Sequence, residues 1–492
     1  MHPHPARSHR RTHDARRDAR RPFDLIFFNK MSKSSSTSNP AAKRRVARLS
    51  AHVTSSQAPA KNYHTLQTPA GAVRFPNHFL RENLKASWDA NSLQRVDFRL
   101  WADHVVTSST RLTDTSFLLG FDDGAVGEFH LPSTSPYARG IDIEALPKAI
   151  WGAGEKHAVL RKLGTRYSGA SGASGASGLR FSWGDLAVKD SKELSGLAAE
   201  QLGEGRAKLT PAVAQVRSAL IEATHKYGMA IIDHVPCVPD QGVLLSDAVV
   251  GAVETTNFGY KFVIKSVRDP HNLAFDNIYL QHHTDFTYCR KCPDVALFHC
   301  LNNADKGGDS LWLDGFACAE ELRRTDPSAF DLLTKVQVRH MDVTDKWDLQ
   351  ASHPTIEVDH GTGEIKRIYF NERTRDSWRA WNAAHGKDGP GVSGVEDPQT
   401  SPEFYHALKS FEKILEDTRF HINTPLQPGE LVVFDNARVL HSRTAFEGAR
   451  HMEGAYLEWG AFYATWRSLQ PQIRGRPDVY CGNVVGAIGG GM

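Results

Sequence analysis

The sequence contains no run of eighteen consecutive apolar residues, so it offers no candidate transmembrane helix. Its 6 cysteines among 492 residues are too few for a disulfide scaffold. No secretory signal precedes them, which indicates a reducing compartment. With 40% apolar and 23% charged residues, the composition also excludes a collagen-like fibre and a wholly disordered chain. We expect one large and one small folded unit.

Positive charge is scarce outside the first 50 residues. That stretch carries 13 Lys and Arg against three Asp, a net charge of +10, whereas the other 442 residues carry 46 basic and 53 acidic groups, a net of −7. An acidic body argues against nucleic acid as a partner. We interpret residues 1–62 as a disordered basic tail. The alternatives are a mitochondrial presequence or a true start at Met31, so we expect a cytoplasmic or a mitochondrial protein.

Changes in composition divide the rest of the chain. Short apolar clusters broken by Asp122-Asp123-Gly124 predict strands in a small β-rich domain. The Ser-Gly-Ala repeat between Ser168 and Gly178 is typical of a flexible linker. The predicted boundaries are 63–150 for the small domain, 151–201 for the linker, 202–470 for the large domain and 471–492 for a C-terminal tail.

Local patterns in the large domain favour strands with helices packed outside them. Thr210 and Gly228 are typical helix ends around an apolar periodic stretch, and residues 229–232 read as a buried strand. Residues 314–324 and 402–417 are expected to be helical. Because no βαβ rhythm is present, we predict a mainly β fold with flanking helices, either a sandwich or a barrel.

Two segments far apart in the chain carry candidate metal ligands. In Leu280-Gln281-His282-His283-Thr284-Asp285, an extended backbone would place His283 and Asp285 on one face and His282 on the other. His441 on another strand could complete a two-histidine, one-carboxylate face, which on iron(II) leaves three open positions. By spacing alone, surface or hydrogen-bonded histidines remain the alternative, since the chain has 24 histidines.

Two arginines follow His441. A bidentate co-substrate such as 2-oxoglutarate would fill two open positions on the iron and leave a second carboxylate to be bound. The planar fork of an arginine suits that carboxylate, and Arg450 and Arg443 are the candidates. The alternative is that both are surface arginines in a hairpin.

Residues from about 202 to 469 resemble the γ-butyrobetaine dioxygenase and trimethyllysine dioxygenase family, within the taurine-dioxygenase-like iron(II), 2-oxoglutarate oxygenases. The matching stretches, in family order, are His283-Thr284-Asp285, Leu297-Phe298-His299-Cys300-Leu301, Gly307-Gly308-Asp309-Ser310, Asp314-Gly315-Phe316, Arg438-Val439-Leu440-His441-Ser442-Arg443-Thr444-Ala445-Phe446 and Arg450-His451-Met452-Glu453-Gly454-Ala455-Tyr456.

The resemblance implies a double-stranded β-helix, or jelly-roll, catalytic domain. It implies iron(II) bound by His283, Asp285 and His441, with 2-oxoglutarate held by Arg450 and helped by Arg443. Molecular oxygen would be the co-substrate, ascorbate the reductant, and a homodimer the assembly. The implied reaction is hydroxylation of γ-butyrobetaine to L-carnitine. Trimethyllysine 3-hydroxylation and a noncatalytic jelly-roll binding module are the alternatives.

Family substrates carry a trimethylammonium group, which aromatic rings bind by cation–π attraction. The resemblance places Phe258, Phe262, Phe275 and Tyr456 at the substrate, together with Asn272 and Asn371 as hydrogen-bonding candidates. The three phenylalanines could instead simply pack in the core.

The small domain departs from the family at its zinc site. Phe75-Pro76-Asn77-His78-Phe79 resembles the family's amino-terminal signature. The positions of the four zinc ligands in many relatives appear here as Leu84, Ala86, Asp89 and Ala125, so we expect this domain to fold without zinc. The pair Cys289 and Cys292 is a lone CxxC and predicts no metal site.

Overall fold

The structure is a computed structural model that describes residues 63–69, 71–87, 104–131, 143–168, 178–188, 209–265, 277–344, 346–377 and 398–474. It divides into two compact units, Met1–Ala138 and Arg139–Met492. Within the described ranges, no helix combines the length and the apolar character needed to cross a bilayer.

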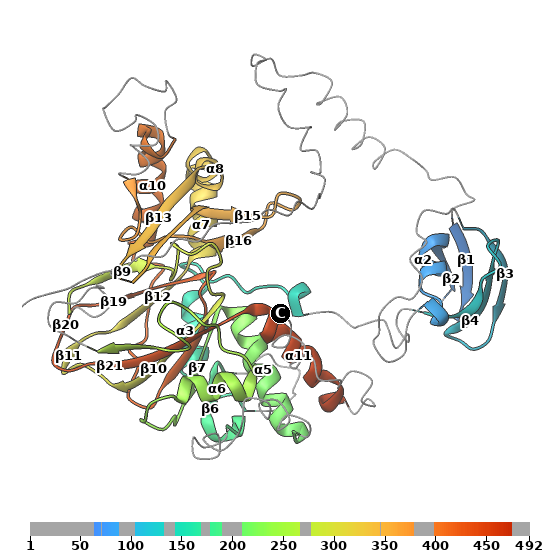
Figure 1. Cartoon of the computed structure of the whole chain (residues 1–492), viewed down its shortest axis with the longest axis horizontal. Coiled ribbons are helices and arrows are strands. Elements are labelled where there is room, and N and C mark those ends of the chain that lie inside the picture. Colours follow the sequence, from blue (N-terminus) through green and yellow to red (C-terminus); the bar gives the residue numbers. More distant parts are fainter. Residues whose placement is uncertain are drawn as a thin grey trace, which may run out of the picture. The chain divides into compact units, whose positions relative to one another are not determined.

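In its described residues, the first unit contains small antiparallel sheets and a short α-helix (Figure 1). Its elements are β1 (Tyr63–Thr68), β2 (Gly71–Pro76), α2 (Asn77–Glu82), η2 (Lys85–Ser87), β3 (Val106–Arg111), β4 (Ser116–Phe121) and β5 (Val126–His130). The hairpin β1–β2 and the sheet β3–β4–β5 enclose a small apolar core that includes Leu66, Leu80, Phe117 and Phe129. Gly124 turns the chain between β4 and β5 at φ 83°, a conformation that favours glycine.

The segment 151–201, for which the sequence predicts a linker, contains elements that pack into the second unit. These are α3 (Lys156–Leu163), β6 (Arg180–Ser182) and η4 (Trp183–Leu186), preceded by η3 (Ile143–Ala145). Trp151, Val159 and Phe181 are buried in the main core of that unit. The Ser-Gly-Ala repeat itself lies largely outside the described residues.

Two sheets form the body of the second unit. The larger has the order β6-β7-β18-β10-β21-β8, with β7 (Met229–Asp233), β18 (Leu431–Asp435), β10 (Val295–Asn302), β21 (His451–Leu457) and β8 (Phe262–Lys265). The smaller has the order β17-β12-β19-β9, with β17 (Ile422–Asn423), β12 (Ser310–Asp314), β19 (Val439–Arg443) and β9 (Leu280–His283). A short pair, β11 (Lys306–Gly307) and β20 (Phe446–Glu447), forms a separate two-stranded sheet. The predicted mainly β architecture with flanking helices is confirmed.

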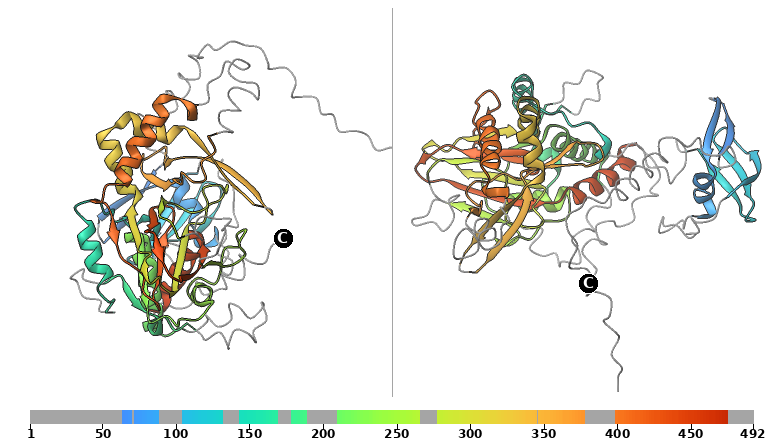
Figure 2. Two further views of the ribbon diagram at one scale, coloured as in Figure 1. Left: turned by 90° about the vertical axis from the view of Figure 1, so that its left-hand side faces the viewer. Right: turned by 90° about the horizontal axis from the view of Figure 1, so that it is seen from above.

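Helices cover the larger sheet. The helices α5 (Pro211–Tyr227) and α11 (Trp459–Arg474) pack against each other, and α6 (Gln241–Val249) packs on β21 and β10 (Figure 2). Every residue of β7 and of β18 is buried, as expected for strands covered on both faces. The helix predicted after Thr210 is confirmed: the Thr210 hydroxyl accepts a hydrogen bond from the Val213 N–H at 3.3 Å, and Gly228 ends the helix at φ 80°.

One parallel strand pair departs from the sequence expectation. β6 and β7 pair in parallel, with α5 between them in the chain, so these elements form a βαβ connection. β6 is only three residues long and follows the low-complexity repeat. A strand of this length is too short to show an alternating apolar pattern, so its sequence does not predict it.

A second helical layer has its own core. It contains α7 (Gly315–Thr325), α8 (Pro327–Lys335), η8 (Pro398–Thr400) and α10 (Pro402–Leu415), and α10 packs on both α7 and α8. Two hairpins accompany it: β13 (Gln337–Val343) with β14 (Asp348–Pro354), and β15 (Ile356–Val358) with β16 (Ile365–Ile368). The helices predicted over 314–324 and 402–417 are confirmed within two residues at each end.

A fully buried ion pair ties the helical layer to the sheets. Arg438 Nη2 lies 2.6 Å from Asp314 Oδ2, and both side chains have 0% exposure. The Asp314 carboxylate also caps α7 by accepting a hydrogen bond from the Phe316 N–H. The remaining Arg438 donors bind the carbonyl oxygens of Lys226 and Ala149. The pair therefore joins four segments that are remote in sequence.

Replacing Asp314 by alanine is expected to lower the free energy of unfolding by about 3–5 kcal/mol, because it leaves the Arg438 charge buried and uncompensated. Asp331→Ala is the matched control, since its partner Lys335 and its own side chain are 67% and 60% exposed, and the expected loss is below about 1 kcal/mol. Urea unfolding followed by tryptophan fluorescence measures both. Equal losses in the two variants would contradict a structural role for the buried pair.

Candidate metal centre and pocket

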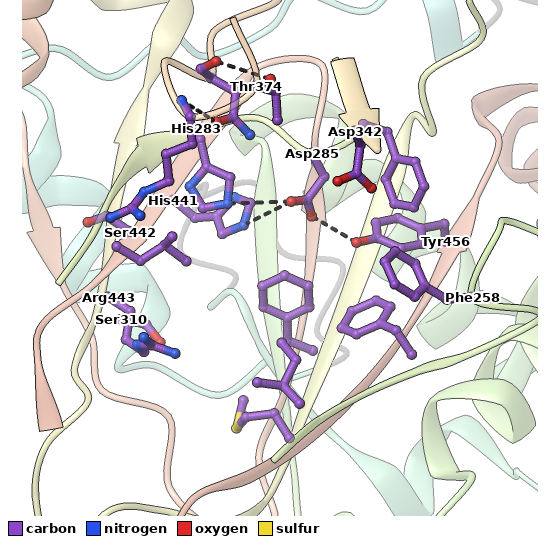
Figure 3. Close-up of a pocket in the computed structure, with 18 of the residues that line it drawn as sticks. Phe258, His283, Asp285, Ser310, Asp342, Thr374, His441, Ser442, Arg443 and Tyr456 are labelled. Atoms are coloured by element: carbon purple, nitrogen blue, oxygen red, sulfur yellow. Dashed lines mark hydrogen bonds and ion pairs between the residues drawn. The ribbon is translucent and has the colours of Figure 1, made fainter. Parts of the chain in front are cut away.

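Strand pairing brings the three predicted metal ligands together. His441 on β19 lies opposite His283 on β9 in the antiparallel register, and Asp285 follows β9 by two residues. One ligand atom from each residue lies within 4.8 Å of the others. Asp285 Oδ1 is 3.5 Å from His283 Nε2 and 3.7 Å from His441 Nε2 (Figure 3). The His283 and His441 ring centroids are 4.3 Å apart. The structure thus places an oxygen and two nitrogens around one point.

The hydrogen bonds of His283 present the correct nitrogen. His283 Nδ1 lies 2.7 Å from the Gln281 carbonyl oxygen, which can only accept, so Nδ1 is the donor there and Nε2 is the nitrogen directed toward Asp285. The His441 ring is fixed differently, by edge contacts with Phe298 and Phe434. His282 points away from the centre, as strand alternation predicts: its Nε2 lies 3.2 Å from Ser442 Oγ.

The charge state of the three groups suits a divalent cation. Burial lowers the pKa of His441 to about 3, so its ring is neutral near pH 7. Burial by itself raises the pKa of Asp285, but His441, His283 and the Tyr456 hydroxyl outweigh it and hold the pKa at about 2. One carboxylate anion therefore faces two imidazole nitrogens, at least one of them neutral.

Asp285 is held at both its backbone and its carboxylate. Its N–H donates to Asn436 Oδ1 at 2.8 Å, and Asn436 Nδ2 donates back to the Asp285 carbonyl at 3.3 Å. The Tyr456 hydroxyl donates to Asp285 Oδ2 at 2.9 Å. Asn436 is fully buried at the turn before β19. The carboxylate is thus fixed before any metal binds.

A cavity of about 280 Å³ opens beside the three ligands. Phe298, Met452 and Tyr456 line it from the larger sheet, and Trp312 and Arg443 line it from the smaller one. The pocket therefore lies between the two sheets.

Both predicted arginines lie on one side of this pocket. The guanidinium carbons of Arg443 and Arg450 are 4.8 and 5.9 Å from the ring centroid of Phe446. Arg443 donates to the carbonyl of Ile278 at 2.9 Å. Arg450 is 8% exposed, and burial lowers its pKa. Its Nε atom is buried with no hydrogen-bond partner, and no carboxylate of the described chain forms an ion pair with Arg450. A buried arginine in this state fits an anionic ligand.

Aromatic rings form another wall. The Phe262 and Tyr456 centroids are 5.0 Å apart, and Phe286 lies 4.9 Å from Tyr456 and 6.0 Å from Phe258. Phe258 is 37% exposed, whereas Phe262 is 8% exposed and also belongs to the main core. Phe262 therefore lines the pocket and packs in the core at once.

Of the remaining predicted substrate residues, Asn371 lines the pocket, whereas Asn272 and Phe275 lie outside the described residues. The sequence analysis did not predict the other lining residues, among them Phe286, Tyr288, Asp342, Arg373 and Thr374. Phe286 and Tyr288 lie within three residues of the His283-Thr284-Asp285 motif, so their closeness to it in the sequence could have identified them as pocket residues.

The other candidate clusters have local partners. His104, Asp122 and Asp123 lie close together in the first unit, but Asp123 Oδ2 is 2.9 Å from Arg81 Nη2, and the Asp122 carboxylate accepts the Val105 N–H. Of the positions corresponding to the family zinc ligands, Leu84 is part of the apolar core. Burial raises the pKa of Cys289 to about 11 and of Cys292 to about 12, so both thiols are protonated.

Comparisons with known proteins point in one direction. Residues 190–456 match the family model described as taurine catabolism dioxygenase TauD, TfdA family. A trimethyllysine dioxygenase of Meyerozyma guilliermondii is 32% identical over 235 residues, which cover 47% of this chain and 55% of that protein. A human gamma-butyrobetaine dioxygenase is 31% identical over 231 residues, which cover 46% of this chain and 56% of that protein.

A gamma-butyrobetaine dioxygenase of Pseudomonas sp. is 30% identical over 253 residues, which cover 50% of this chain and 61% of that protein. The chain thus matches these curated relatives over little more than half their length. Among solved structures, a taurine dioxygenase from Burkholderia xenovorans aligns with a TM-score of 0.35 at 16% identity, covering 56% of this chain and 84% of that one.

Proposed function

Because the chain belongs to the taurine catabolism dioxygenase TauD, TfdA family, we propose that it is an iron(II)- and 2-oxoglutarate-dependent dioxygenase that hydroxylates a quaternary ammonium substrate. The observation that carries the proposal is the convergence of His283, Asp285 and His441 beside a pocket lined by Arg450, whose buried Nε has no hydrogen-bond partner among the described residues. We also propose that the two sheets of the second unit form the double-stranded β-helix implied by the family resemblance.

Iron(II) fits this donor set better than zinc. Two imidazole nitrogens and one carboxylate oxygen would hold the ion, and the adjacent cavity leaves room for further ligands. Zinc sites more often close with a fourth protein ligand or keep a single water. When bound, iron(II) would supply the oxygen activation that couples decarboxylation of 2-oxoglutarate to hydroxylation of the substrate.

The residues of this chain bind and orient the reactants. The Arg450 guanidinium would pair with the far carboxylate of 2-oxoglutarate, leaving the keto acid end directed at the three ligands. Arg443, beside the same Phe446 ring, adds positive charge to that side. The aromatic wall opposite excludes water from the reacting carbon. The substrate would thereby be held in the pocket beside Tyr456 and the ligand triad.

The aromatic rings of the pocket and a carboxylate beside them support a cationic substrate. Phe258, Phe286 and Tyr456 each present a ring to the pocket, and every ring facing an ammonium contributes about 0.5–2 kcal/mol. Asp342 lines the same pocket and hydrogen-bonds the Tyr288 hydroxyl, which places a carboxylate beside these rings. Asn371 is available to bind a substrate carboxylate.

We propose γ-butyrobetaine as the substrate, with L-carnitine as the product, and trimethyllysine as the second candidate. Relatives with these two names match 47% and 46% of the chain at 32% and 31% identity. A noncatalytic binding module is disfavoured because all three metal-binding side chains are present. Ascorbate as reductant, a homodimeric assembly and a cytoplasmic or mitochondrial location stay predictions, as does the division into domains.

A succinate-release screen tests the proposal directly. With iron(II), ascorbate and 2-oxoglutarate, γ-butyrobetaine is expected to stimulate succinate release well above the background, and trimethyllysine less so. The neutral isostere 5,5-dimethylhexanoate is the matched control, because a carbon replaces the charged nitrogen at nearly constant shape. Its KM is expected to be at least about tenfold higher, since the cation–π contribution is lost.

Two results would count against the proposal. If no quaternary amine stimulated succinate release while the protein bound iron(II) and 2-oxoglutarate, the substrate class would be wrong. If the isostere and γ-butyrobetaine gave the same KM, the rings would act only as apolar surface.

A further inference from the structure

Tyr456 reaches the metal centre as well as the substrate wall. Its hydroxyl donates to Asp285 Oδ2 at 2.9 Å, whereas the other carboxylate oxygen, Oδ1, faces His283 Nε2 and His441 Nε2 at 3.5 and 3.7 Å (Figure 3). The two oxygens of Asp285 therefore have different partners. One is engaged by a tyrosine and the other points at the place where a metal would bind.

We propose that Tyr456 is a positioning residue for Asp285, which directs a single carboxylate oxygen at the metal and keeps the second oxygen away from it. This inference rests on the proposed function and deepens it. The family resemblance implies a role for Tyr456 only in binding the substrate through its ring, whereas the hydroxyl has a separate task.

The need for such a residue follows from coordination numbers. Two histidines and one carboxylate oxygen leave three of six positions open. The keto acid end of 2-oxoglutarate needs two of these and oxygen needs the third. A carboxylate that bound through both oxygens would take one of the three and block a reactant. A hydrogen bond on Oδ2 opposes that rearrangement, because the bond must break before Oδ2 can turn to the metal.

The surroundings hold the Tyr456 hydroxyl in place. The β21 backbone pairs with β10 at Ala296, and on its other side the Tyr456 carbonyl accepts the Glu254 N–H at 2.8 Å. The ring is packed between Phe262 and Phe286, at centroid distances of 5.0 and 4.9 Å. With its backbone and ring fixed, the side chain loses little further entropy when the hydroxyl binds Asp285.

Asn436 does not duplicate this role. Its amide binds the backbone N–H and carbonyl of Asp285 and so fixes where the residue lies. These hydrogen bonds reach only the backbone of Asp285, so they do not fix the rotation of its carboxylate group. Among the described residues, the Tyr456 hydroxyl donates to Asp285 Oδ2, whereas the two histidine ligands approach Oδ1.

Tyr456→Phe separates the two roles, because it keeps the ring and removes the hydroxyl. The dissociation constant for Mn(II), a redox-stable substitute for iron(II), is expected to rise about 10- to 100-fold in isothermal titration calorimetry, the usual effect of losing a residue that orients a metal ligand. The KM for γ-butyrobetaine should stay within about twofold of the parent, since the aromatic wall is intact.

Tyr463→Phe is the matched control. Tyr463 is also a buried tyrosine, and its hydroxyl lies 3.0 Å from His225 Nδ1, but it does not line the pocket. This variant should bind Mn(II) like the parent. Melting temperatures of both metal-free variants establish that each is folded.

The outcomes are distinct. If Tyr456→Phe bound Mn(II) as tightly as the parent and Tyr463→Phe, the positioning role would be refuted while the proposed function stood. If Mn(II) affinity were unchanged and only the KM for γ-butyrobetaine rose, Tyr456 would act at the substrate alone, which also refutes it. If the parent itself bound no divalent metal, the proposed function would fail.

Discussion

Replacing His283 by alanine is expected to lower 2-oxoglutarate turnover by about 10³-fold or more. The ring supplies one of three metal ligands, and its Nε2 is prepared for that task by the Nδ1 hydrogen bond to the Gln281 carbonyl. A 10³-fold loss corresponds to about 4 kcal/mol of transition-state stabilisation, within the several kcal/mol that a catalytic metal contributes. Succinate release at saturating iron(II), 2-oxoglutarate and γ-butyrobetaine measures the effect.

The adjacent histidine provides the control. His282 precedes His283, is also buried, and points to the other face of β9, where its ring centroid lies 4.4 Å from that of His421. Because it does not line the pocket, His282→Ala should keep turnover within about threefold of the parent, provided that its melting temperature shows a folded protein. If His283→Ala decarboxylated 2-oxoglutarate as fast as the parent, the catalytic interpretation would be wrong.

The difference between these two histidines was predictable from sequence. Side chains alternate along a strand, so His283 and Asp285 fall on one face wherever the segment is extended. The position of His441 opposite His283 was not predictable from local pattern, because the register of two strands separated by over 150 residues is a property of the whole sheet. The prediction that His283 and His441 belong to one site came from the family resemblance.

Other residues of the pocket could not be predicted from local sequence patterns. Asp342 enters from the β13–β14 hairpin, which belongs to the helical layer, and no motif surrounds it. Phe286 reaches the pocket from a backbone at φ 63°, a conformation that an aromatic residue rarely adopts and that alternation rules cannot anticipate. Contacts between distant segments and strained backbone are both set by tertiary packing.

Arg450→Met is expected to raise the KM for 2-oxoglutarate about 100-fold with a much smaller effect on the KM for γ-butyrobetaine. A bidentate, charge-assisted pair with a carboxylate is worth about 3 kcal/mol, which corresponds to that factor. Methionine keeps most of the volume of the arginine stem in contact with Phe446. Arg419→Met, on an exposed arginine that binds Asp417, is the control and should leave both KM values unchanged.

The same substitution should stabilise the protein in the absence of ligand. Arg450 is a buried cation without an acidic partner in the described chain, and burial already lowers its pKa, so the free protein pays a desolvation cost at this position. Methionine removes that cost, and the melting temperature of the ligand-free variant is expected to rise by about 1–3 °C.

Ligand should reverse the order of stability. With Mn(II) present, 2-oxoglutarate at 100 times its dissociation constant stabilises the parent by about 2.7 kcal/mol, whereas a variant with 100-fold weaker binding gains only about 0.4 kcal/mol. The parent should therefore melt above Arg450→Met when 2-oxoglutarate is bound and below it when it is absent. A variant less stable than the parent under both conditions would show that Arg450 serves the fold. If Arg450 serves to bind an anionic ligand, its charge is compensated only in the complex. The parent should then be the less stable protein without 2-oxoglutarate and the more stable one with it.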